Sequence, residues 1–164
     1  MQTKYTKIVA VLTIGFVLVG MQFALSANTA NVAATVMVQN ISLSVADGSV
    51  AYGTLASNTT KSTCTSELSD LQIITNDGNI AETFNIKGQN SANWTLAATA
   101  ASDQYVHKFA TSTCATFSGG TALTTSYATA QSNVAASATS SLNLQITTPN
   151  PSTVFTQQSV DVGL

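Results

Sequence analysis

The side chains able to do chemistry in this chain are few and widely spaced. Its 164 residues include one His, two Cys, seven Asp or Glu, five Lys and no Arg. Cys64 and Cys114 are 50 positions apart, which fits neither a metal-ligand pattern nor a redox motif. In an oxidising compartment two such cysteines pair by default, so we predict one disulfide, stabilising the fold by about 4 kcal/mol in the chain-entropy model. The rival prediction, a Cys nucleophile paired with His107, requires a free thiol.

No motif gathers the remaining groups into a catalytic or metal site. His107 lies two residues from Tyr105 and from Phe109, so the three share one face of an extended segment. We expect a partly buried or rim histidine rather than a catalytic base, because no Ser or Cys motif with an acid accompanies it. The run Asn76-Asp77-Gly78-Asn79 offers oxygen ligands to calcium but lacks enough acids, so we predict a turn. The sequence therefore predicts no enzyme, no cofactor and no metal.

Four further residues are candidates for modification or ligand contact. Asn40, Asn58 and Asn93 each begin an N-x-S/T tripeptide, the acceptor pattern for N-glycosylation. With 12 Asn and 45 Ser or Thr in the chain, three matches are close to chance, so glycosylation depends on the host. Trp94 is the only Trp; core packing is the favoured role, and stacking on a ligand is the alternative.

The composition excludes several classes of partner. Thr, Ser and Asn occupy 57 of the 164 positions, and the formal net charge is −2. Without Arg the chain cannot supply the basic stripe that nucleic-acid binding requires, nor a polybasic membrane-surface patch. A hydrophobic content of 45% with low charge is the reverse of the usual signature of disorder. These residues indicate a folded domain without a nucleic-acid partner.

The first 27 residues are predicted to be a secretory signal peptide. Lys4 and Lys7 precede an uncharged apolar run at residues 8–27, and small residues at its end allow cleavage after Ser26 or Ala27. A retained membrane helix is the alternative, while a type IV pilin leader is disfavoured because no Gly precedes the run. Residues 28–164 then form a single domain with three Lys against seven acids, a charge of 3 − 7 = −4. We expect this domain to be extracellular, at the cell surface, with membrane contact only through an uncleaved leader.

The elements that must position these residues are predicted to be short strands. Apolar and polar residues alternate with period two, and Gly, Asn and Pro separate the segments. Asp47-Gly48 predicts a hairpin turn, whereas residues 128–138, rich in Ala, are expected to be a helical turn or a loop. We therefore predict an all-β antiparallel sandwich, Ig-like or jelly-roll, of eight or nine strands. The predicted segments are residues 36–45, 50–52, 71–74, 84–88, 94–98, 105–109, 123–127, 142–146 and 160–164.

Two stretches carry a family resemblance. ISLSVADGSVAYGTLASNTTKST and LQIITNDGNIAETFNIKGQNSANWTLAA resemble secreted β-sandwich surface proteins of bacteria, and more distantly the camelysin-type biofilm-fibre subunits and the WxL surface domains. The fibre resemblance implies subunits joined by donation of an N-terminal strand, with residues 28–45 as the donor. The WxL resemblance implies cell-wall association through Trp94-Thr95-Leu96, although the second WxL copy of that family is missing.

These observations rank three functions. The first is a structural subunit of an extracellular fibre, pilus-like appendage or surface layer, a homopolymer held together by strand exchange. The second is a monomeric adhesion or glycan- and cell-wall-binding module, with specificity in loops such as 57–65 and 111–121. A secreted hydrolase is the third and weakest.

Overall fold

The computed structural model describes residues 30–164. The chain divides into two units at Met37 and Val38, and the body discussed below is the unit from Val38 to Leu164. The predicted leader, residues 1–27, lies outside the described residues. Within residues 30–164, no helix has the length and apolar character needed to cross a membrane.

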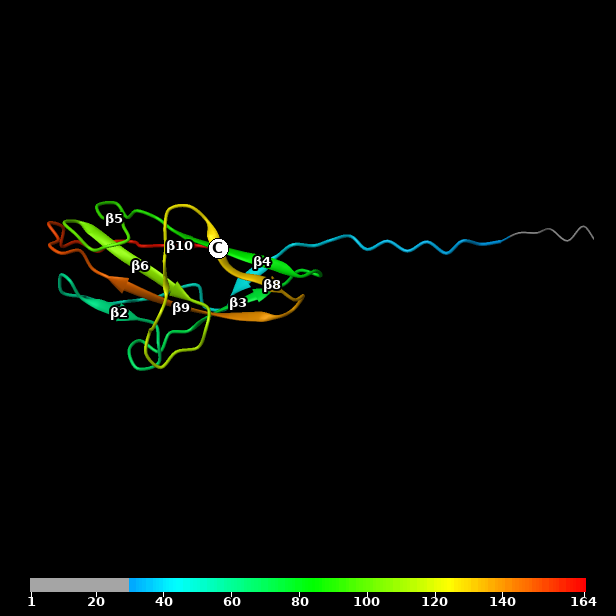
Figure 1. The fold of residues 1–164 in the computed structure, drawn as a ribbon, viewed down its shortest axis with the longest axis horizontal. Coiled ribbons are helices and arrows are strands. Elements are labelled where there is room, and N and C mark those ends of the chain that lie inside the picture. The colour runs from blue at the N-terminus through cyan, green and yellow to red at the C-terminus, as the bar shows by residue number, and fades with distance from the viewer. Residues whose placement is uncertain (1–29) are drawn as a thin grey trace, which may run out of the picture. The chain divides into compact units, whose positions relative to one another are not determined.

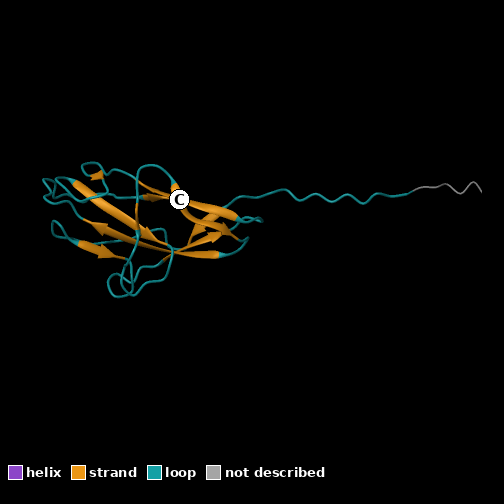
Figure 2. Ribbon diagram, viewed as in Figure 1, coloured by secondary structure: helices purple, strands orange, loops and turns teal. Residues whose placement is uncertain are grey.

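Strands are the only regular elements of residues 30–164, as Figure 2 shows, and they form two sheets. This confirms the all-β prediction. The strands are β1 (Leu43–Val45), β2 (Thr60–Ser62), β3 (Gln72–Asn76), β4 (Glu82–Gly88), β5 (Thr95–Leu96), β6 (Gln104–Ala110), β7 (Thr121–Ala122), β8 (Ala128–Val134), β9 (Thr139–Thr147) and β10 (Val162–Gly163).

The seven-stranded sheet is organised around β9, the longest strand (Figure 1). One edge of β9 pairs with β3 along its first half and with β2 along its second, while β6 pairs with the opposite edge. β1 extends this sheet beyond β3, and β5 and β7 extend it beyond β6. All of these pairings are antiparallel except that of β5 with β6.

The smaller sheet has the order β10-β4-β8, and both sheets contribute to one hydrophobic core. Alternation with period two turns Phe84 and Ile86 of β4 inward, where they are 1% and 0% exposed. They join Leu142 and Leu144 of β9, together with residues from β3, β6 and β8. The strongest alternation in the sequence, at residues 84–88 and 142–146, therefore lies in two core strands.

Residues 128–138 do not form the helical turn or loop predicted from their Ala content. Residues 128–134 are strand β8, which pairs with β4, and only residues 135–138 form the turn into β9. The pairing has register shifts between Glu82 and Asn85, so the apolar residues of β8 do not alternate regularly. Val134 is nevertheless buried in the core.

The hairpin predicted at Asp47-Gly48 is also wrong. Gly48 has the positive φ expected of a tight turn, +74°, but β1 pairs with β3 rather than with residues 50–52. The Gly48 N–H donates to Oε1 of Gln72 at 2.8 Å, which directs the chain toward β3. Residues 50 and 52 then pack against the core as part of an irregular segment.

The proposed donor segment, residues 28–45, has two distinct parts. Residues 43–45 are β1, and the stretch just before it is already bonded to the β3–β4 turn. The N–H of Asp77 donates to the Ser42 carbonyl at 2.9 Å, and the N–H of Asn79 donates to the Asn40 carbonyl at 3.1 Å. Residues 30–37 belong to the other unit and contain no helix or strand. Strand donation would therefore have to use residues upstream of Val38.

Candidate functional site

The described body has a cavity of about 1150 Å³ against the larger sheet. Leu142, Leu144 and Ile146 line it from β9, because even-numbered side chains of that strand face the interior. The other lining includes His107 on β6, Trp94 just before β5, Val162 on β10 and most of two irregular segments, residues 48–57 and 152–161. The two irregular segments and the end of β10 border the space, which is partly open to solvent.

His107 is the most unusual side chain of the cavity. It lies on β6 and is only 2% exposed, more deeply buried than the partly buried or rim position expected from the sequence. Its Nε2 lies 3.0 Å from the hydroxyl of Tyr52. Burial lowers the pKa of His107 to about 4, so its ring is neutral at neutral pH. Its Nδ1 is buried and has no hydrogen-bond partner in the described structure.

Two tyrosines accompany this histidine. Burial raises the pKa of Tyr52, and the charge of Asp70 raises it further. Burial also raises the pKa of Tyr105 to about 12, with a smaller contribution from Asp161. The Tyr105 hydroxyl donates to the carbonyl of Gln89. Both phenols are therefore neutral hydrogen-bonding groups rather than bases.

Trp94 lines the cavity just before β5. Its indole Nε1–H donates to Oγ of Ser152 at 3.1 Å, and its ring centroid lies 6.2 Å from that of Tyr105. Oδ1 of Asp103 accepts hydrogen bonds from Ser152 Oγ at 3.3 Å and from the Thr153 N–H at 2.7 Å, which holds the second loop in place. The hydrogen bonds from Thr153 lower the pKa of the Asp103 carboxyl. Trp94 is thus half-buried and joins β5 to the loop that encloses the cavity.

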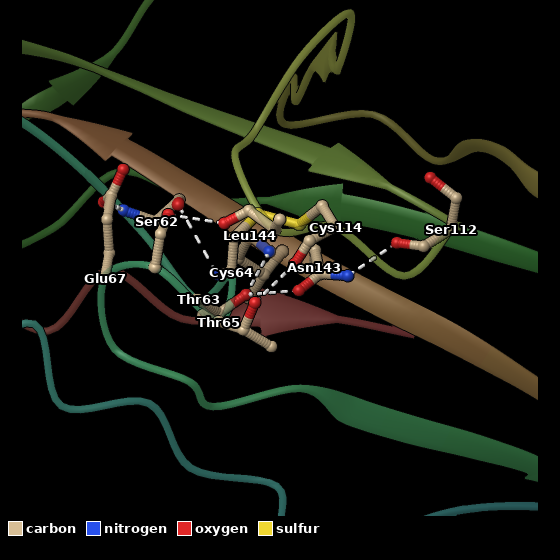
Figure 3. The surroundings of a disulfide bond; sticks show 11 residues. Ser62, Thr63, Cys64, Thr65, Glu67, Ser112, Cys114, Asn143 and Leu144 are labelled. Atoms are coloured by element: carbon tan, nitrogen blue, oxygen red, sulfur yellow. Dashed lines mark hydrogen bonds between the residues drawn. A yellow bond between two sulfur atoms is a disulfide. The ribbon is translucent and has the colours of Figure 1, made fainter.

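The predicted disulfide between Cys64 and Cys114 is present, with a Cα–Cα distance of 5.2 Å (Figure 3). It joins the loop after β2 to the loop between β6 and β7, the two loops considered above as separate specificity loops. Beside it, Thr63 and Asn143 are each 1% exposed, and Oγ1 of Thr63 donates to Oδ1 of Asn143 at 3.1 Å. Nδ2 of Asn143 donates to the Ser112 carbonyl at 2.6 Å. The bridge therefore lies in a buried polar network that ties both loops to β9.

The three predicted glycosylation acceptors are exposed and lie apart from one another in the fold. Asn40 precedes β1, Asn58 lies in a turn before β2 with a positive φ of 56°, and Asn93 lies in a turn before β5. All three side chains are accessible to solvent. The structure brings none of them into the cavity lining, whereas the neighbouring Trp94 lies there.

The predicted turn at residues 76–79 is confirmed, and Asn76 is its centre. Its Nδ2 donates to the carbonyls of Ile80, Val134 and Ala135 at 2.8, 2.9 and 3.2 Å. Its Oδ1 accepts from the Gly78 N–H at 2.8 Å, so all side-chain groups of this fully buried residue are used. Residues 30–164 contain no cluster of three His, Cys, Asp or Glu side chains able to hold a metal ion.

Sequence reasoning missed the Tyr52–His107 pair and the Thr63–Asn143 network. Positions 105, 107 and 109 do share the inner face of β6. The partners lie 55 and 80 residues away, however, and the strand pattern gives no signal for such contacts. No family model, curated protein or solved structure matches this chain.

Proposed function

We propose that this chain is a structural subunit of an extracellular fibre, pilus-like appendage or surface layer, in which copies join by strand donation. The two sheets would form an Ig-like or jelly-roll sandwich that each neighbouring copy completes with one strand. The disulfide supports an oxidising, extracellular location, since such bonds persist outside the cytoplasm. The proposal depends on two parts of the chain, a donor segment and an acceptor edge.

The acceptor is the edge of β4 that faces away from β8, and it carries the proposal. β10 pairs with this edge only at Lys87 and Gly88. Residues 82–86 have no strand on that side in the described part of the chain, although Phe84 and Ile86 are core residues. An edge with unpaired N–H and C=O groups is a template for pairing with another chain.

The donor is the segment at residues 30–37. Its even positions, Ala30, Val32, Ala34 and Val36, are all apolar, while the odd positions 31, 33, 35 and 37 are Asn, Ala, Thr and Met. Alternation with period two is the pattern of a strand with one buried face. The segment carries no charge, so pairing it with β4 would desolvate no ionised group. The next residue, Val38, belongs to the body: its side chain is 81% exposed, and its carbonyl accepts a hydrogen bond from Nδ2 of Asn79 at 2.8 Å.

The test compares two substitutions on opposite faces of the donor. In Val36→Asp the charge would enter the interface with β4, so we expect loss of assembly. In Met37→Asp the same charge would face solvent, so we expect assembly to persist. Light scattering of the purified protein over a range of concentrations, followed by negative-stain imaging, distinguishes the two.

Equal assembly of the two variants would contradict the proposed register of the donor strand, because that register places the side chains of residues 36 and 37 on opposite faces. A native protein that stays monomeric at millimolar concentration would contradict the polymer itself. Circular dichroism of both variants controls for folding, and it should be unchanged because residues 36 and 37 lie outside the strands.

A further inference from the structure

β1 lies at one end of the larger sheet, and its outer edge is open. On the inner edge, the Ser42 carbonyl accepts from the N–H of Asp77, and the N–H of Ala46 donates to the Ile73 carbonyl, both at 2.9 Å. Backbone groups alternate in direction along an antiparallel pair, so those of the odd positions 41, 43 and 45 point away from β3. No strand of residues 30–164 pairs with the edge that they form.

The apolar side chains of this segment face the core, but the core does not cover them. Val45 packs against the core, and period two places Leu43 and Ile41 on the same face of the sheet. Leu43 is nevertheless 41% exposed, and Ile41 is 74% exposed. A further strand on this edge would bring its own side chains against these two residues. The core is therefore incomplete at β1.

The sequence around β1 lacks the features that usually protect an edge strand. Residues 38–46 contain no charged side chain and no Pro, and the register of β1 with β3 has no bulge. Lys, Pro and bulges are the common means of preventing pairing at an exposed edge. When two identical strands pair about a twofold axis, a charge near the axis also meets its own copy. An uncharged strand therefore fits a second copy of the same chain.

We propose that β1 pairs with β1 of a second copy, antiparallel and about a twofold axis at Leu43. In this register Leu43 lies opposite Leu43 of the second copy, and Ile41 lies opposite the second copy's Val45. These pairs use the backbone groups that point outward, and each pair exchanges two hydrogen bonds. Their apolar side chains then share one face and cover one another.

The contact would join two copies of the larger sheet into one continuous sheet. It uses neither the donor segment nor the edge of β4, so it is independent of assembly by strand donation. Five residues from each copy make a small interface, and small interfaces belong to weak complexes. We therefore expect a dimer that becomes populated between micromolar and millimolar protein.

Opposite charges at the twofold axis test the pairing. Sedimentation equilibrium is measured on the chain carrying Val36→Asp, the change expected to stop growth through the donor segment. In Leu43→Asp or Leu43→Lys, added to that chain, identical charges would face each other, so we expect the dimer to weaken at least about tenfold. An equal mixture of the two should form a heterodimer at least about fivefold tighter than either variant alone. Salt should weaken this heterodimer.

Ser44→Asp is the matched control. Ser44 is exposed on the outer face of β1 and, in the proposed register, lies opposite Ser42 rather than its own copy. The same charge at this position should weaken the dimer less than about threefold. Circular dichroism checks the folding of each variant, and a heterodimer that forms on mixing shows that both Leu43 variants are folded.

Three results would overturn the proposal. A Val36→Asp chain that stays monomeric at millimolar concentration would show that the edge of β1 binds no second copy. Leu43 variants that dimerise as strongly as the parent chain would place the contact elsewhere. Loss of the dimer in both Leu43 variants without recovery on mixing would exclude the twofold register. Failure of strand donation has a different signature, namely a chain without Val36→Asp whose growth stops at the dimer.

Discussion

Two buried polar residues, Asn76 and His107, differ in how many of their polar atoms form hydrogen bonds. Asn76 uses its whole amide to close the turn between β3 and β4, with three donated bonds and one accepted. His107 uses one nitrogen, on Tyr52, and leaves the other unpaired. The first arrangement is typical of a structural residue, whereas an unpaired buried nitrogen is rare in native structures.

The buried histidine makes folding depend on pH. An unfolded His titrates near pH 6.5, whereas burial lowers the pKa of His107 to about 4. Between these values the unfolded chain holds a proton that the folded chain lacks, so stability falls as the pH falls through this window. We expect a loss of about 2 kcal/mol between pH 7.5 and pH 5, measured by urea unfolding. Because this is the only His, His107→Gln should remove that part of the slope, and identical slopes would contradict the buried, neutral ring.

Sequence reasoning at this scale was correct about faces but not about partners. Parity along residues 105–109 predicted that Tyr105, His107 and Phe109 point the same way, and they do. The contact of His107 with Tyr52 depends on the path of residues 46–59 across the sheet. That path follows from side-chain contacts such as the Gly48–Gln72 bond, which local periodicity does not encode.

At the scale of elements, prediction succeeded for the strands with the strongest alternation of their own. It failed at residues 50–52 and 123–127, which alternate but are irregular, and at strands that are defined by the strand they pair with. The inner residues of β4 and β9 alternate strongly, and both strands were predicted. β2 is Thr-Lys-Ser and β8 is rich in Ala, Ser and Thr, so neither has an apolar signature. β2 is a strand because it pairs with an edge of β9, and β8 is a strand because it pairs with β4. Pairing context of this kind overrides intrinsic preference.

The disulfide connects two loops, and its removal should have a measurable effect on the free energy of unfolding. Replacing both Cys64 and Cys114 by Ser should lower the free energy of unfolding by about 4 kcal/mol, because the bridge closes a loop of 50 residues. Urea unfolding of the double variant against the native protein gives the value. Asn143→Ala is a useful comparison, since it removes the bonds to Thr63 and Ser112 but keeps the bridge. A double variant as stable as the native protein would contradict a stabilising bridge.

For the whole molecule, the important division is between the N-terminal unit and the body that begins at Val38. The period-two alternation predicted an all-β chain, and the composition predicted one poor in reactive groups. The described residues form two sheets around one core. The apolar phase changes from even positions at Val36 and Val38 to odd positions at Ile41, Leu43 and Val45, which predicted a bulge or bend near residues 39–40. The alternation does not show, however, whether residues 43–45 pair with their own chain or with another. Pairing with β3 assigns them to their own chain.

Two deletions measure this division. Removing residues 30–37 should abolish assembly and change the free energy of unfolding by less than about 0.5 kcal/mol, since no strand is lost. Removing residues 30–45 should also cost at least about 2 kcal/mol, because it deletes β1 and the packing of Val45 against the core. Urea unfolding and light scattering report the two effects separately. Assembly that survives the shorter deletion would exclude the N-terminal segment as donor.

The bridge between Cys64 and Cys114 also determines how this chain responds to tension. The loop that it closes contains β3, β4, β5 and β6, whereas β9, the central strand of the larger sheet, lies outside it. When the two ends of the chain are pulled apart, those 50 residues cannot extend, even after their strands have separated. At about 3.5 Å per residue this withholds about 170 Å of contour length. The maximum extension of a subunit under force would therefore be much shorter than its residue count implies, because the covalent loop does not extend.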